Sequence, residues 1–345
     1  MTKEIDTTNG ADTQKPQKGQ FRKTADRLRR GKENHLSHRA SVIWHADAQH
    51  VCDVHTRSDV VVPVDEIKAL LLKSRTAQSL FEAFEENPLE IVHDNQVPLS
   101  QFYARGERRI VAINPYRPKG DLVNLLSREL RRAWHHLQGS LVNPLSFEPD
   151  EAILFNRAQQ ADALMISIKI AWELKLIGEP EAWDYLVGSP TADVTRTFEM
   201  KAQSDFRSMN NGEAARAAYD KFFEGNRTKS YDKRIIHQML LDEVGYMRTT
   251  ERRPKMSVDA LRRLGVMPQG KNYLALSQAR SPADLCYATV EDRSNANFLW
   301  FIKFERSFQE KELQMVQESV KMSAEIVDFA KWALQSRQSD SLPQA

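Results

Sequence analysis

The chain has 345 residues, 41% of them hydrophobic and 28% charged, which fits a globular protein of one large or two ordinary domains. The net charge at pH 7 is only +2, so the overall composition does not demand a polyanionic partner. Its two cysteines exclude a disulfide framework and a cysteine-based zinc site. The first 20 residues lack the apolar run of a secretory signal, and no stretch approaches the roughly 18–20 apolar residues that span a bilayer. We therefore expect a cytoplasmic protein without a membrane span.

Residues 1–40 are polar and poor in large apolar side chains, which predicts a disordered basic arm. Residues 15–39 contain nine Lys or Arg and two acidic residues, so their net charge is nine minus two, or +7. Such a stretch can make weak contacts with nucleic acid through its phosphates. Phe21 is its single aromatic residue, which leaves little for base stacking. A solvated tail is the alternative.

The next residues predict short strands and one helix. The β-branched run at residues 60–62 is typical of a strand. Apolar residues at helical spacing predict a helix over 65–86, with Asp65 as its N-cap and a stop at Asn87-Pro88. Apolar runs at 89–92 and 108–113, separated by turn residues, predict a small antiparallel strand pair.

Long helices dominate the rest of the chain. We expect one over 122–139, capped by Asp121 and Gly139, and another over 151–178. A third, over 297–335, has apolar stripes that do not share one heptad register, which argues against a long coiled coil. The predicted fold is α+β and predominantly α-helical. It comprises the arm (1–40), a helical domain (41–270) and a C-terminal helical segment (271–345) that packs on the domain or on a partner.

The segment with recognisable chemistry is L-S-R-E-L-R-R-A-W at residues 126–134. In zincins, two histidines at i and i+4 of a helix bind Zn²⁺, and the glutamate after the first acts on the bound water. Together with RRIVAINP before it and NRAQQADA after it, the segment resembles an uncharacterised metallopeptidase family. The helix of that family carries HELRH followed by A-W, and its next helix carries E-A-D-A. The resemblance covers roughly residues 65–237 and implies a zincin-like helical domain.

Carried over by position, the resemblance places Arg128 and Arg132 where the two histidine ligands would be, and Gln160 where the glutamate ligand would be. Glu129 is the retained acid of the motif. A guanidinium group stays protonated in proteins and has no lone pair for a metal, and two of them would repel Zn²⁺. We therefore expect no metal, no cofactor and no catalytic residue at this degenerate motif.

The two arginines have three alternative roles. They could form an ion-pair cluster with Glu129 and Asp162 that ties two helices together in place of a metal. They could line a pocket for a carboxylate or phosphate. The helix face could instead have turned to solvent.

A displaced metal site is a further alternative, built from His135 or His136 with Asp162, Asp150 or Glu151. Adjacent residues of a helix point about 100° apart, so His135 and His136 cannot both face one metal. An ordinary hydrogen bond is more common for a histidine near a helix end.

These observations favour a catalytically inactive, metallopeptidase-like protein, a pseudoenzyme that acts as a binding or regulatory module for an unidentified protein partner. One alternative is a nucleic-acid-associated protein that uses the basic arm. Another is an active metal-dependent hydrolase with non-standard ligands.

Overall fold

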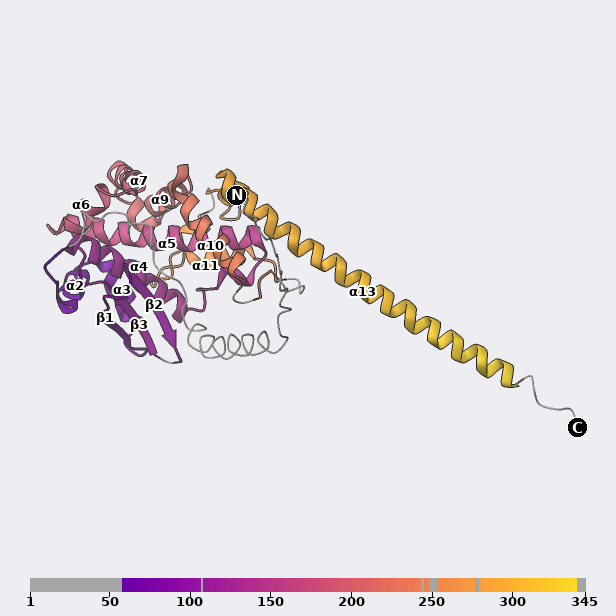
Figure 1. Ribbon diagram of the computed structural model, residues 1–345. Coiled ribbons are helices and arrows are strands. Elements are labelled where there is room, and N and C mark those ends of the chain that lie inside the picture. Colours follow the sequence, from indigo (N-terminus) through magenta and orange to yellow (C-terminus); the bar gives the residue numbers. More distant parts are fainter. Residues whose placement is uncertain (1–57, 107, 243–244, 248–252, 277–278, 340–345) are drawn as a thin grey trace, which may run out of the picture.

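The computed structural model describes residues 58–339 apart from 107, 243–244, 248–252 and 277–278 (Figure 1). The predicted basic arm with its cationic stretch 15–39, and the predicted start of the helical domain at residue 41, lie outside the described residues. Helices and one three-stranded sheet confirm the predicted, mainly helical α+β class. The elements in chain order are α2 (Val64–Leu71), α3 (Arg75–Glu82), β1 (Leu89–His93), β2 (Ser100–Arg105), β3 (Arg108–Ile113), α4 (Lys119–Leu137), η3 (Pro144–Ser146), α5 (Pro149–Leu176), α6 (Glu181–Val187), α7 (Ala192–Ser204), α8 (Ser208–Asn211), α9 (Glu213–Phe222), η4 (Gly225–Arg227), α10 (Thr228–Leu241), α11 (Val258–Leu264), η5 (Tyr273–Ala275), α12 (Leu285–Ala288) and α13 (Arg293–Ser339).

The helix predicted over residues 65–86 is two helices, α2 and α3. Ser74 separates them, because its backbone is extended and its hydroxyl caps α3 by accepting a hydrogen bond from the backbone N–H of Ala77. The helix α2 begins after Pro63, so Asp65 lies inside its first turn and is not the cap. Residues 60–62, predicted as a strand, are not in one.

The sheet has the order β1-β3-β2, in which β1 pairs with β3 in parallel and β2 pairs with β3 in antiparallel. The predicted antiparallel pairing of residues 89–92 with 108–113 is therefore wrong. The sequence of β2, SQFYAR, has no β-branched residue and gave no strand signal. Because this additional strand reverses the chain once more, β1 and β3 run in the same direction. Ser100 and Phe102 of β2 are buried where the sheet packs against α4.

The boundaries of α4 position the residues that follow it. The helix begins after Pro118, so Asp121 lies in its first turn, where it forms an ion pair with Arg117 and does not act as the predicted cap. Gly139, after the last turn, has a φ of +65°, in the left-handed region that favours glycine. The backbone N–H of Ser140 then donates to the carbonyl of His135 at 2.9 Å. This turn brings Ser140 back beside the end of α4.

The helix α5 lies at the centre of the body, packed against α3, α4, α6, α9 and α10 (Figure 1). It is buried along nearly its whole length, with apolar residues on all sides, as expected for a helix surrounded by others. At the start of α4, a Cβ atom on Gly120 would lie 2.3 Å from the carbonyl oxygen of Glu181, so the glycine allows α6 to pack closely. The α4–α5 pair is therefore enclosed by the sheet and by the surrounding helices.

The last helix, α13, has 47 residues and is longer than the helix predicted over 297–335. Its first turns contact α10 and α5, and the rest runs away from the body (Figure 1). Among the described residues, no helix combines the length and the apolar character needed to cross a membrane.

Candidate functional site

Two of the positions that the family resemblance assigns to metal ligands, Arg128 and Arg132, lie on one buried helix. Residues 120–135 of α4 are all buried between the sheet, α5 and neighbouring helices. Arg128 is 8% exposed and Arg132 is 4% exposed, so the alternative of a face turned to solvent is wrong. Buried arginines are rare in proteins unless they are paired.

Arg132 is the centre of a first cluster. Its Nη1 donates to Glu129 Oε1 at 2.6 Å and its Nη2 donates to Gln160 Oε1 at 2.6 Å. Ser100 of β2 donates its hydroxyl hydrogen to the same Glu129 oxygen at 2.8 Å. We call these four residues the Glu129 cluster. It connects α4, α5 and the sheet, and it joins Glu129 to two of the three positions that the resemblance assigns to metal ligands.

A second cluster surrounds Asp162, which is fully buried on α5. Arg131 holds its carboxylate with two hydrogen bonds, from Nε to Oδ2 at 2.8 Å and from Nη2 to Oδ1 at 3.0 Å. The Tyr273 hydroxyl donates to Oδ1, and Nε2 of His135 contacts Oδ2, both at 2.7 Å. We call these four residues the Asp162 cluster. Arg131 also donates to the carbonyl of Leu264 at 2.5 Å, so the cluster ties α11 and η5 to the α4–α5 pair.

The charges within the Asp162 cluster follow from burial and proximity. Burial alone would raise the pKa of Asp162, but the Arg131 charge and the hydrogen bonds outweigh it and hold that pKa well below its usual range. Burial and the Arg131 charge lower the pKa of His135 to about 4 against the opposing effect of Asp162. Burial and the Asp162 charge raise the pKa of Tyr273, so its hydroxyl keeps its proton. At neutral pH the pair of charges is therefore Asp162 and Arg131.

A neutral His135 has one defined tautomer in this network. An ionised carboxylate only accepts hydrogen bonds, so Nε2 of His135 carries the proton and donates to Asp162. Its unprotonated Nδ1 accepts from the Ser140 hydroxyl at 2.7 Å. The turn after α4 thereby fixes the orientation of the imidazole ring.

This histidine predicts a pH dependence of stability. In the unfolded chain His135 takes a proton near pH 6.5, whereas in the folded chain it does so only near pH 4. Between these values the unfolded state binds more protons, so the free energy of unfolding falls as the pH falls, by about 3 kcal/mol in total from this group. His135→Gln keeps an N–H for Asp162 but cannot titrate, so its melting temperature should fall less steeply over this window.

The matched control is His237→Gln, at an exposed position of α10, which should retain the wild-type slope. Thermal unfolding at several pH values measures all three proteins. Equal slopes for wild type and His135→Gln would contradict the neutral, buried histidine.

The structure separates Asp162 from the predicted cluster of Arg128, Arg132 and Glu129. Gln160 and Asp162 are two residues apart on α5, so their side chains point about 200° apart around the α5 axis. They therefore reach α4 on different sides. Asp162 faces Arg131 instead. Arg131 and His135 share a face of α4 by their i, i+4 spacing, and this was the one sequence signal for the second cluster. Ser100 and Tyr273 come from distant segments and gave none, and neither did Ser140, which lies in the turn after α4, five residues from His135.

The displaced metal site finds no support in the described residues. His136 packs against the Phe102 ring, with centroids 5.5 Å apart. Asp150 pairs with Lys303, and Glu151 accepts a hydrogen bond from the backbone N–H of Met256. No group of three His, Cys, Asp or Glu side chains that could hold a metal ion occurs in the part of the chain that the structure describes.

Zinc, which a zincin-like centre implies, does not fit the residues at the ligand positions. Two of them are guanidinium groups without a lone pair, and the third, Gln160, offers only a neutral amide oxygen. That oxygen already accepts the hydrogen bond from Arg132. The arrangement can bind helices together through charge, but it supplies no ligand set for Zn²⁺.

Comparisons with known proteins agree with the motif. Residues 46–275, two thirds of the chain, match the family described as Putative metallopeptidase family (DUF6782). Searches of curated proteins and of solved structures give no match. The matched range includes the sheet, the α4–α5 pair and Tyr273, and so both clusters. The chain belongs to this metallopeptidase family.

Proposed function

We propose that this member of the metallopeptidase family has no peptidase activity and acts as a non-catalytic binding or regulatory module. The observation that carries the proposal is the pairing of Arg132 with both Glu129 and Gln160. Arg132, at one of the expected ligand positions, forms an ion pair with Glu129, the acid of the motif. It also donates a hydrogen bond to the amide oxygen of Gln160, at a second ligand position.

The chemistry of a zinc peptidase explains why this pairing matters. The metal lowers the pKa of its bound water, and the neighbouring glutamate takes the proton during attack on the peptide. In this chain Glu129 is fully buried and held by Arg132 and Ser100. Its Oε1 therefore already accepts two hydrogen bonds from neighbouring side chains. The metal-binding groups that would activate water are replaced, and the acid of the motif is engaged by a side chain at one of their positions.

The alternative of a hydrolase with other ligands would need histidines that are available to a metal. His135 uses both ring nitrogens, for Asp162 and Ser140. The nucleic-acid alternative depends on residues 15–39, outside the described residues, and stays a prediction.

Metal analysis and an activity assay test the proposal together. Chain purified without chelator, incubated with one equivalent of Zn²⁺ and then dialysed, should retain far less than one equivalent by mass spectrometry. It should not hydrolyse a mixed peptide library above the rate of its Glu129→Gln variant. Stoichiometric zinc, or hydrolysis that depends on Glu129, would overturn the proposed loss of activity.

A further inference from the structure

Within the described residues, the first turns of helix α13 anchor it to the body. Leu299 and Ile302 are buried in a small core with residues of α5 and α10. Lys303 pairs with Asp150, and Arg306 donates to Glu148 and to the carbonyl of Tyr246. From there the helix extends away from the body to Ser339 (Figure 1).

A second face of α13 presents large apolar side chains to solvent. These residues are between 43% and 70% exposed. The rings of Trp300 and Phe304 stack with centroids 5.3 Å apart, and those of Phe304 and Phe308 stack at 6.4 Å. We call this face the α13 stripe, and its members are Trp300, Phe301, Phe304, Phe308, Met315 and Met322.

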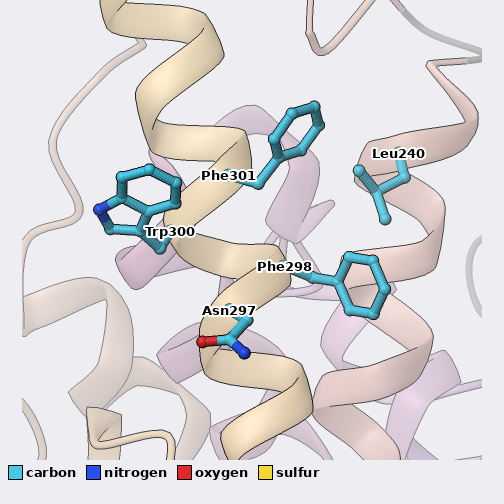
Figure 2. Close-up of a pocket in the computed structure, with 5 residues that line it drawn as sticks. All are labelled: Leu240, Asn297, Phe298, Trp300 and Phe301. Atoms are coloured by element: carbon cyan, nitrogen blue, oxygen red, sulfur yellow. The ribbon is translucent and has the colours of Figure 1, made fainter.

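The stripe begins at an open apolar groove between α10 and α13. Leu240, Asn297, Phe298, Trp300 and Phe301 line the groove, and Figure 2 shows the Phe298 and Phe301 rings on the side of α13 that faces Leu240. An exposed apolar surface of this extent marks an interaction site in a water-soluble body.

The spacing along the stripe is that of a coiled coil. Phe301, Phe304, Phe308, Met315 and Met322 occupy positions of one heptad pattern, with steps of three and four residues, and Lys311 and Glu318 fill the remaining positions. The residues that face the body, Leu299 and Ile302, lie on a different face. The apolar residues of this segment share no single heptad register because one set packs against the body and the other set forms the exposed α13 stripe.

We propose that the α13 stripe is a dimer interface, which pairs with the stripe of a second copy of this chain in an antiparallel arrangement. A heptad stripe on an isolated helix requires another helix, and a second copy provides one of equal length and matching pattern. A lipid surface would favour a polar face rich in Lys and Arg. The opposite face of α13 combines Glu310 and Gln317 with the exposed Leu313 and Val320, so it lacks that basic character.

The two charged positions within the stripe determine the orientation. In a parallel pair, Lys311 would face Lys311 and Glu318 would face Glu318, which is unfavourable. In an antiparallel pair, Lys311 of each copy lies within about one turn of Glu318 of the other, so opposite charges meet.

The length of the helix and the groove fit the same arrangement. At 1.5 Å per residue, α13 is roughly 70 Å long. Full antiparallel overlap brings the distal turns of one copy, whose sequence at 325–334 is EIVDFAKWAL, beside the groove at Phe298 and Phe301 of the other. Each body then lies at one end of the pair, so the two do not collide.

Sedimentation velocity of the full chain, from roughly 1 to 100 μM, tests the association. We expect a dimer that dissociates on dilution. Met315→Glu/Met322→Glu places charges in the interface and should weaken association at least about a hundredfold. The matched control Gln317→Glu adds charge on the opposite face and should leave association unchanged. A wild-type chain that remains monomeric throughout, or a double variant that dimerises like wild type, would overturn the proposal.

A distance between labels tests the orientation. A spin label on Ser307→Cys, in a Cys52→Ser/Cys286→Ser background, lies nine residues before the centre of α13. In the antiparallel pair two labels are roughly 30 Å apart, and in a parallel pair about 10 Å. Pulsed electron resonance distinguishes the two values, and the short one would overturn the antiparallel arrangement. Circular dichroism of each variant shows that α13 has remained helical.

Discussion

Replacing Asp162 by Asn should lower the free energy of unfolding by about 3–5 kcal/mol at neutral pH, because it leaves the buried charge of Arg131 without a counter-ion. Each carboxylate oxygen accepts two hydrogen bonds, Oδ1 from Arg131 and Tyr273 and Oδ2 from Arg131 and His135. In either orientation the amide NH₂ of Asn would therefore face two donors. We expect the melting temperature to fall by on the order of 10 °C, measured by calorimetry or circular dichroism.

An exposed ion pair provides the control for Asp162→Asn. Glu90 and Arg108 pair at 2.8 Å on the surface of the sheet, where solvent screens their charges. Glu90→Gln should change the unfolding free energy by less than about 1 kcal/mol. If Asp162→Asn were as mild as Glu90→Gln, the Asp162 cluster could not be what holds α11 and η5 to the α4–α5 pair.

The second large effect is expected on metal affinity. The variant Arg128→His/Arg132→His/Gln160→Glu restores the ligand types that the family resemblance places at these positions. Histidines at i and i+4 share a face of α4, and the 2.6 Å contact between Arg132 and Gln160 shows that positions 132 and 160 face each other. We expect the triple variant to retain about one equivalent of Zn²⁺ after dialysis, whereas wild type should not.

Gln160→Glu alone is the control for this experiment, because it adds the carboxylate but keeps both arginines, and it should bind no more zinc than wild type. Circular dichroism establishes that each variant is folded. A folded triple variant with wild-type zinc content would mean that the position-by-position alignment with the family motif is wrong.

The sequence predicts the central helices well, and the reason is local. Residues 122–139 and 151–178 were expected as helices, and α4 and α5 cover Lys119–Leu137 and Pro149–Leu176. Apolar periodicity and glycines after the last turn define such helices without reference to the rest of the fold. The expected pairing of Arg132 with Glu129 also depends on local spacing, since the two are three residues apart on one helix.

What the sequence could not predict depends on contacts between distant segments. The strand β2 has polar and aromatic residues without a β-branched pattern, and its pairing with β3 makes it a strand. The partner of Asp162 is selected by the rotation of α5 against α4, which places Arg131 and not Arg132 beside it. Tyr273 reaches the same carboxylate across 111 positions of sequence, a separation at which no spacing rule applies.

That long reach of Tyr273 has a consequence for how the chain matures. During synthesis, α4 and α5 leave the ribosome well before Leu264 and Tyr273 do, so the Asp162 carboxylate must wait for the Tyr273 hydroxyl, and Arg131 for the carbonyl of Leu264. Until then, Asp162 and Arg131 lack part of the hydrogen bonding that they have in the folded protein. A fragment cut at residue 270, the boundary expected from the sequence, would keep this defect permanently, whereas one that ends after Ala275 would not.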